Sequence, residues 1–122
     1  MNSEELIQKL KDAFKAEAEE RLSTISTSLA ALQSAISSPE QQQPLLEILF
    51  REAHSLKGAS RVVNLEEVES LSQSAEETFG ALKKGEIQLS PELFEEVCHT
   101  VDDIKAVLMN FKKDQTPVRG VA

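Results

Sequence analysis

The chain has 122 residues, of which 40% are apolar and 28% are charged, and its formal net charge at pH 7 is -8. A chain of this length fits one domain, and its composition is typical of a folded globular protein rather than a disordered one. The acidic balance argues against nucleic acid as a partner, because such binding depends on basic side chains that neutralise phosphates. With 1 cysteine and 2 histidines, neither an internal disulfide nor a metal site is expected.

The composition also predicts the fold class and the location of the protein. Tyr and Trp are absent and Gly and Pro number only 4 each, so the residues that favour strands and turns are scarce. An all-α fold is therefore predicted. No apolar stretch is long enough to span a bilayer, and the N-terminus, MNSEELIQKLKDAF, lacks the apolar core of a signal peptide. A cytoplasmic protein that does not insert into a membrane is expected.

The first half of the chain predicts two helices. Apolar residues recur at steps of four and three over residues 4–36, which is the pattern of one helix face. These residues are Leu10, Phe14, Ala18, Leu22, Ile25, Leu29, Leu32 and Ile36. The polar run 37–43 has no such period and is predicted as a loop. Pro44 suits the first turn of a second helix over 44–63, because no backbone N–H is needed there.

The second half predicts two more helices. Asn64 is placed to cap a helix over 65–84, with Glu67 as its capping-box partner, and Gly85 is placed to end it. The expected apolar stripe of this helix is Val68, Leu71, Ala75, Thr78 and Leu82. Ser90 and Pro91 are a start signal for a fourth helix over 91–113, and residues 114–122 are expected to begin a linker or disordered tail. Together the four amphipathic helices predict an antiparallel four-helix bundle formed by residues 1–113.

His54 is the residue that the helical pattern singles out. It lies opposite the apolar stripe of its helix, so its imidazole is expected to face solvent. Its neighbours on that face are Phe50, Arg51, Lys57, Gly58 and Arg61, which predicts a locally basic surface. The other histidine, His99, has acidic neighbours that would repel a phosphate, and it is interpreted as an incidental surface residue.

A histidine beside cations suits phosphoryl transfer, because the moving group carries negative charge that cations stabilise. Lys57 is the candidate for that role. Glu76, in the third helix, is the candidate acceptor that holds one ring N–H of His54 while the other nitrogen attacks. Gly58 costs the helix roughly 0.5–1 kcal/mol relative to alanine. Because helical side chains lean toward the N-terminus, any side chain at position 58 is expected to lie across His54, and glycine leaves the imidazole open.

The same residues also have a purely structural explanation. An exposed histidine beside a lysine is commonly part of a solvated face, and Arg51, Arg61 and Glu76 are equally consistent with ordinary surface charges. On that alternative the chain is a helical protein-interaction module that is never phosphorylated. An enzyme with its own active site is not predicted, because no glycine-rich phosphate loop, cofactor motif or distinctive carboxylate pair is present in the sequence.

Residues 50–63, FREAHSLKGASRVV, resemble the His-x-x-Lys-Gly signature of histidine-phosphotransfer (Hpt) domains. The resemblance is closest to the P1 domain of CheA-type chemotaxis histidine kinases and extends over most of the chain. It implies that His54 is the phosphoacceptor, that Lys57 and Gly58 are the lysine and glycine of the motif, and that Glu76 orients the imidazole. Gln73 stands where such domains often have a second histidine.

The resemblance also implies partners. A domain of this kind takes a phosphoryl group from an ATP-bound histidine kinase domain and passes it to an aspartate of a response-regulator receiver domain. It needs no cofactor and is not itself an enzyme. The expected docking residues are Phe50, Arg51, Arg61 and Gln73, and the domain is expected to be a monomer. Two settings stay open, namely the N-terminal domain of a CheA-like or hybrid sensor kinase and a free-standing phosphorelay carrier.

Overall fold

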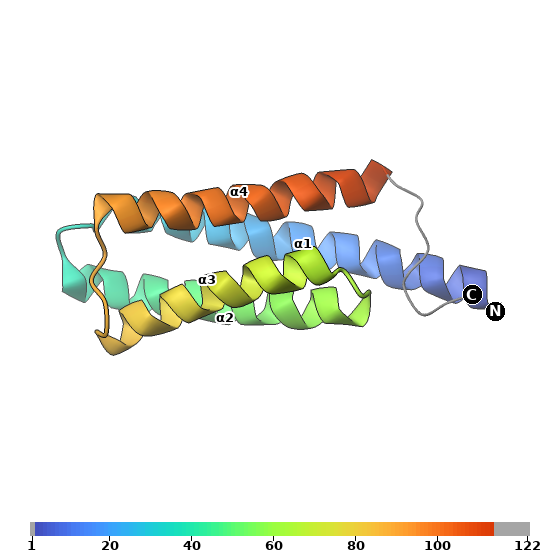
Figure 1. Cartoon of the computed structure of the whole chain (residues 1–122), viewed down its shortest axis with the longest axis horizontal. Helices are drawn as coiled ribbons and strands as arrows, with labels where there is room; N and C mark the ends of the chain where they lie inside the picture. The colour runs from blue at the N-terminus through green and yellow to red at the C-terminus, as the bar shows by residue number, and fades with distance from the viewer. Residues whose placement is uncertain (1, 114–122) are drawn as a thin grey trace.

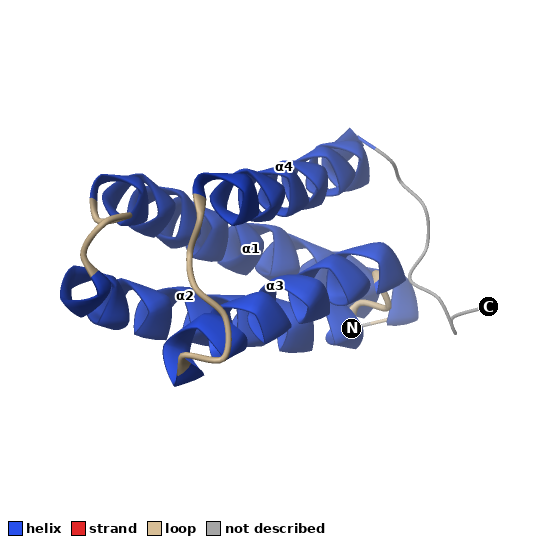
Figure 2. Ribbon diagram, turned by 60° about the vertical axis from the view of Figure 1, so that its left-hand side comes forward, coloured by secondary structure: helices blue, strands red, loops and turns tan. Residues whose placement is uncertain are grey.

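The computed structural model describes residues 2–113, and all of their regular structure is helical (Figure 2). The helices are α1 (Ser3–Ser34), α2 (Pro39–Val62), α3 (Glu66–Lys84) and α4 (Pro91–Lys113). Successive helices run in opposite directions, and each packs against two neighbours in the order α1, α2, α3, α4 (Figure 1). The contact between α2 and α3 is the most extensive. The predicted all-α antiparallel four-helix bundle is thus confirmed, while the expected linker at 114–122 lies outside the described residues.

Most of the apolar stripe predicted for α1 lies in the core. Six of its residues are buried: Phe14, Ala18, Leu22, Ile25, Leu29 and Leu32. The two ends of the stripe differ, because Leu10 is 40% exposed and Ile36, beyond the end of α1, is half-buried. With 32 residues α1 is much longer than the 19-residue α3, and its first turns project past the ends of α2 and α3 (Figure 1). No described helix combines the length and apolar character that crossing a bilayer requires.

The predicted stripe of α3 is partly wrong. Val68, Ala75 and Leu82 are buried as expected, but Leu71 and Thr78 are only half-buried. The core-facing side instead includes Ser72 and Phe79, both fully buried. A pattern that counts only apolar residues passes over Ser72, although its small side chain suits a close contact between helices.

The start predicted for the second helix is also wrong, because α2 begins at Pro39 rather than Pro44. Pro39 occupies the first turn, and the backbone oxygen of Ser38 accepts from the N–H of Gln42 at 3.1 Å. Pro44 lies inside the helix, on its exposed side. The polar run has a structural role that periodicity does not reveal, since the buried amide of Gln42 donates to the carbonyl oxygens of Ala35 and Ile36 at 2.9 and 3.1 Å. These bonds satisfy carbonyl groups at the end of α1 that no helical N–H reaches.

At the connection between α2 and α3, Asn64 has a different role from the predicted one. Its φ of 56° is left-handed, its N–H donates to the Arg61 oxygen at 3.1 Å, and the next N–H, of Leu65, donates to Ser60 at 2.9 Å. This pair of bonds is the Schellman pattern, so Asn64 ends α2. The N-cap position of α3 is Leu65, which supplies no side-chain bond. Asn is among the few residues that tolerate this conformation. An Asn in the sequence is therefore as consistent with the end of one helix as with the start of the next.

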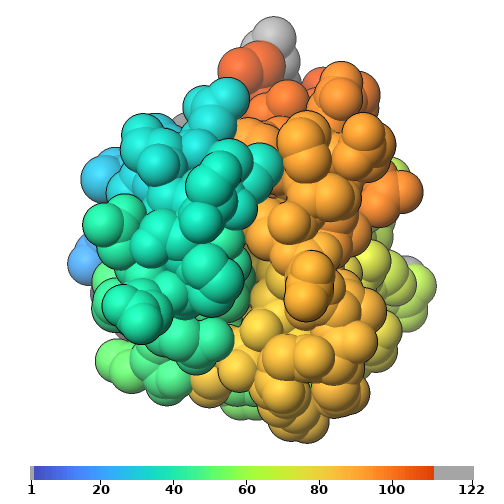
Figure 3. All heavy atoms as spheres, turned by 90° about the vertical axis from the view of Figure 1, so that its left-hand side faces the viewer, coloured from blue at the N-terminus to red at the C-terminus, as the bar shows by residue number. Residues whose placement is uncertain are grey.

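The remaining two signals are confirmed. Gly85 ends α3 with a φ of 75°, and the Ser90 hydroxyl accepts from the N–H of Leu93 at 3.1 Å at the start of α4. The connection between α3 and α4 lies beside the one between α1 and α2 at the same end of the bundle (Figure 3).

Gly85→Ala is expected to lower the free energy of unfolding by about 1–2 kcal/mol, since left-handed backbone is costly for a residue with a Cβ. A Cβ at this position would have no neighbour within 4 Å, so the loss of stability would come from the backbone conformation and not from a steric clash. Urea unfolding measures the difference, with Gly58→Ala as the matched control in ordinary helix. Equal stability of Gly85→Ala and the unmodified protein would contradict the left-handed cap.

Candidate functional site

His54 stands on the exposed side of α2 and is held there from α3. Its side chain is 63% exposed, whereas that of Glu76 is only 10% exposed. The imidazole Nδ1 lies 2.5 Å from Glu76 Oε2. Nε2 makes no hydrogen bond to any of residues 2–113, so the ring is fixed through one nitrogen and free for chemistry at the other.

Lys57 joins the same carboxylate one turn later. Its Nζ donates to Glu76 Oε1 at 2.6 Å and to Gln73 Oε1 at 2.8 Å, and its side chain is 16% exposed. The amide of Gln73 is oriented in turn, because its Nε2 donates to Glu77 Oε1 at 2.6 Å. These side chains form one connected polar network across the interface of α2 and α3. Within it Glu76 is shared by His54 and Lys57.

The charge state of Glu76 follows from its neighbours. Burial alone would raise the pKa of this carboxyl group, but hydrogen bonds and charge attraction from Lys57 and His54 outweigh it, so the pKa is lowered. An ionised carboxylate can only accept hydrogen bonds. A neutral His54 therefore carries its proton on Nδ1, and the lone pair is on the exposed Nε2.

The lowered pKa of Glu76 makes its contribution to stability dependent on pH. A group whose folded-state pKa is depressed stabilises the fold above its ordinary pKa of 4.5, and the contribution is lost as the pH falls through the folded value. The difference in unfolding free energy between the unmodified protein and Glu76→Gln should be full at neutral pH and should shrink below it. Urea unfolding at neutral pH and at about pH 3.5 measures this. A difference that grows on acidification would contradict the assigned contacts.

The surface around His54 is less basic than the helical wheel predicts. Arg51 pairs with Glu47 at 3.5 Å, and Arg61 pairs with Glu69 of α3 at 2.7 Å. Since Lys57 is bound to Glu76, each of the three cations has a carboxylate partner. Glu69 and Glu76 come from α3, and a wheel drawn for α2 alone does not show them, whereas Glu47 lies on α2 itself, one turn before Arg51.

The two remaining predicted residues differ in their surroundings. Gly58 is exposed, and a Cβ built on it would have no neighbour within 4 Å, so a methyl group would not touch His54. The expectation that any side chain at this position covers the imidazole is thus wrong for alanine and is kept for longer side chains. Phe50 is half-buried rather than freely exposed, with the ammonium of Lys83 4.6 Å from its ring centroid.

The sequence matches the family model of the Hpt domain over residues 9–107. The chain belongs to the Hpt domain family. It is 32% identical over 68 residues to the sensor histidine kinase CheAY of Helicobacter pylori, a match covering 56% of this chain and 8% of the relative. It is 27% identical over 97 residues to the chemotaxis protein CheA of Halobacterium salinarum, covering 80% of this chain and 14% of that protein. No solved structure matches significantly.

Membership of the family confirms the resemblance found in the His54 motif and supports a role in histidine phosphotransfer within two-component signalling. An Hpt domain is a phosphoryl carrier rather than a catalyst, in agreement with the prediction that this chain is not an enzyme by itself. The Hpt domain spans only a small part of the curated relatives that it matches. The activities of those whole proteins therefore cannot be assigned to this domain.

Three further residues of this Hpt domain lie near His54 and are not singled out by the sequence pattern. Glu77 orients Gln73, Lys83 covers Phe50, and Gly80 lies against the Phe50 ring. A signal for them exists, because the residues of α3 at this interface are spaced four and three apart, as are those of α2 around His54. Aligning the two patterns in opposite directions would have paired Gly80 with Phe50.

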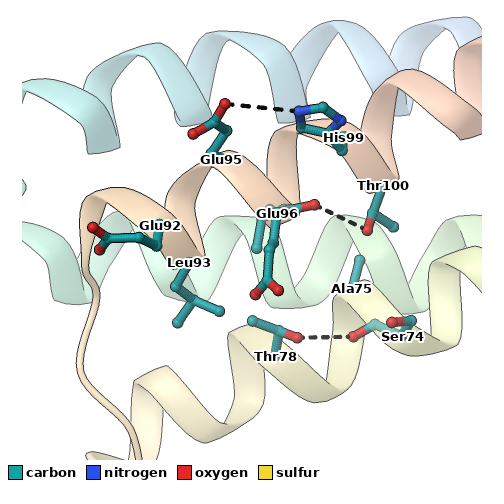
Figure 4. A pocket seen from close by; sticks show the side chains of 10 residues that line it. Ser74, Ala75, Thr78, Glu92, Leu93, Glu95, Glu96, His99 and Thr100 are labelled. Carbon is teal, nitrogen blue, oxygen red and sulfur yellow. Dashed lines mark hydrogen bonds and ion pairs between the residues drawn. The ribbon is translucent and has the colours of Figure 1, made fainter.

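The second histidine of the Hpt domain lies beside a different feature. His99 lines a groove of about 590 Å³ between α3 and α4, together with Ser74, Thr78 and three glutamates (Figure 4). Its Nε2 lies 3.9 Å from Glu95 Oε1. The acidic surroundings expected for His99 are thus present. In residues 2–113 no group of three potential ligand side chains is placed to hold a metal ion.

Proposed function

We propose that His54 accepts a phosphoryl group on Nε2 from an ATP-bound histidine kinase domain and passes it to an aspartate of a response-regulator receiver domain. The observation that carries the proposal is the contact between Glu76 and the exposed imidazole. This contact leaves a lone pair on the nitrogen that a partner can reach. Family membership and the two CheA-type relatives support the same role.

Each transfer exchanges one bond to phosphorus for another. In the first, Nε2 attacks the γ-phosphorus, an N–P bond forms, and the P–O bond to the departing ADP breaks. The ring keeps its proton on Nδ1 and becomes cationic, and the carboxylate of Glu76 stabilises that charge. In the second, an aspartate oxygen of the receiver attacks the phosphorus and the N–P bond breaks. Its electron pair returns to Nε2, so His54 is regenerated without a net proton transfer.

Lys57 is the proposed stabiliser of the phosphoryl oxygens. An ammonium group has three N–H donors, and two of those of Lys57 are used by Glu76 and Gln73. The third is available to an oxygen of the moving group. Its position one helical turn from His54 suits that role.

The other expected residues divide into two groups. Arg51 and Arg61 are exposed, so we assign them to the rim of the docking surface, where charges mainly guide encounter. Phe50 and Gln73 are half-buried at the interface of α2 and α3, closer to the imidazole. We further propose that residues 1–113 act as a monomeric unit, most simply as the N-terminal domain of a CheA-like kinase. A cytoplasmic setting follows from the need for an ATP-bound kinase.

The test is phosphorylation with labelled ATP and a CheA-type kinase domain, followed by mapping of the modified residue. Label on His54 that is lost in acid, kept in base and passed to a receiver domain supports the proposal. A protein that binds these domains but is never labelled would support the alternative of a helical interaction module.

Gly58 variants test access to the imidazole. Gly58→Ala should raise the free energy of unfolding by up to about 1 kcal/mol, because alanine is the better helix former and its methyl group meets open space. Gly58→Gln should slow transfer from the kinase domain more than Gly58→Ala does, since its longer side chain leans toward His54. Phosphoramidate, a small donor, should be affected least. Kinase transfer that is unchanged in Gly58→Gln would refute the access role.

A further inference from the structure

The interface between α2 and α3 presents a continuous row of side-chain contacts at the surface, with His54 near its middle. From one end to the other the contacts are Arg61 with Glu69, Lys57 with Gln73 and Glu76, His54 with Glu76, Phe50 with Gly80 and Lys83, and Glu47 with Lys83. On the side of Lys57 the row is polar. On the opposite side of His54 it contains an aromatic ring.

The position of that ring depends on Gly80. A Cβ built on Gly80 would lie 3.2 Å from Phe50 Cε2 and 3.5 Å from Cδ2, so a methyl group would push the ring slightly outward and a larger side chain would displace it. The ammonium of Lys83 lies over the ring, 4.6 Å from its centroid. The same ammonium is fixed by Glu47 at 2.8 Å. Phe50 is therefore held low against α3.

A glycine at this position is not required by the backbone. Gly80 lies within α3 and has no left-handed φ, and glycine inside a helix is less stable than alanine. The feature that the glycine provides is space for the ring of Phe50. This separates it from Gly85, whose conformation demands a glycine.

We propose that Gly80 is a positioning residue for partner docking: by leaving room for the ring of Phe50 against α3, beneath the ammonium of Lys83, it keeps the surface low one helical turn from His54. A low surface at this position lets the partner domain come close enough for its reacting group to reach the imidazole. The inference rests on the proposed function of His54. A raised ring at position 50 would instead hold the partner away from Nε2.

The experiment compares Gly80→Ala and Gly80→Leu with the unmodified protein. We expect KM for transfer from the kinase domain to rise several-fold in Gly80→Ala and at least tenfold in Gly80→Leu, with the same order for transfer to the receiver. Phosphorylation by phosphoramidate should stay within twofold, because a small donor does not rest on this surface. Ser74→Leu is the control, since Ser74 lines the opposite flank of α3 (Figure 4).

A second variant tests the link to Phe50. In Phe50→Ala/Gly80→Leu the leucine can occupy the space of the missing ring, so KM should recover toward that of Phe50→Ala instead of showing the sum of both defects. Unchanged KM in both Gly80 variants, or additive defects in the double variant, would overturn the inference. So would unfolding of both single variants, because the glycine would then serve packing alone. Absence of His54 labelling in the unmodified protein would instead refute the proposed function.

Discussion

His54→Gln is expected to abolish phosphoryl uptake completely, whereas His99→Gln is expected to leave it unchanged. Only His54 has Nδ1 held by a buried carboxylate, which leaves Nε2 as an exposed nucleophile. Glutamine has no comparable nitrogen, because its amide lone pair is delocalised into the carbonyl group. His99 lies beside an acidic groove that repels a phosphoryl donor.

Phosphorylation of both variants is measured as the labelled phosphate that the protein retains after base treatment. His99→Gln, at an exposed site, should change the free energy of unfolding by no more than about 0.5 kcal/mol. His54→Gln should cost more, since it removes the contact with Glu76, and urea unfolding of each variant checks that the loss of labelling is not a loss of the fold. Labelling that persists in His54→Gln, or that disappears in His99→Gln, would remove His54 as the phosphoacceptor.

The fold was predictable to the extent that apolar periodicity determines which side of a helix is buried. The stripe of α1 is a long repeat of large apolar residues and locates the buried side of that helix well, and the bounds predicted for the fourth helix are those of α4. Periodicity failed where polar residues have structural roles. Gln42 is buried to bond the end of α1, and Glu52, which falls near the apolar side of α2, pairs with Arg21 of α1 at 3.2 Å.

The candidate site was predictable in its local part only. The neighbours of His54 on α2 follow from helical geometry, and Glu76 does reach the imidazole. The pairing of Arg61 with Glu69 and the contact of Gly80 with Phe50 depend on how α2 and α3 align. One helix taken alone contains no information about that alignment. This is why a face predicted to be basic is largely neutralised.

Glu76→Ala is expected to slow phosphorylation of His54 by the kinase domain by about 10–100-fold while leaving KM for that domain nearly unchanged. The carboxylate holds the proton on Nδ1 and balances the charge of the phosphorylated ring, but it is too deeply placed to form a docking surface. The loss should be smaller than in an enclosed enzyme site, because His54 is 63% exposed and water can replace part of the interaction.

Lys57→Ala should also slow the transfer, and the two substitutions should not be additive. Each side chain positions the other through the 2.6 Å ion pair, so removing either one already disturbs both contributions. The Glu76→Ala/Lys57→Ala double variant should therefore be less impaired than the product of the two single losses. Single-turnover rates over a range of kinase-domain concentrations separate the rate from KM. Strict additivity would show that Lys57 acts independently of Glu76, and a raised KM in Glu76→Ala would show that the carboxylate supports docking rather than the chemical step.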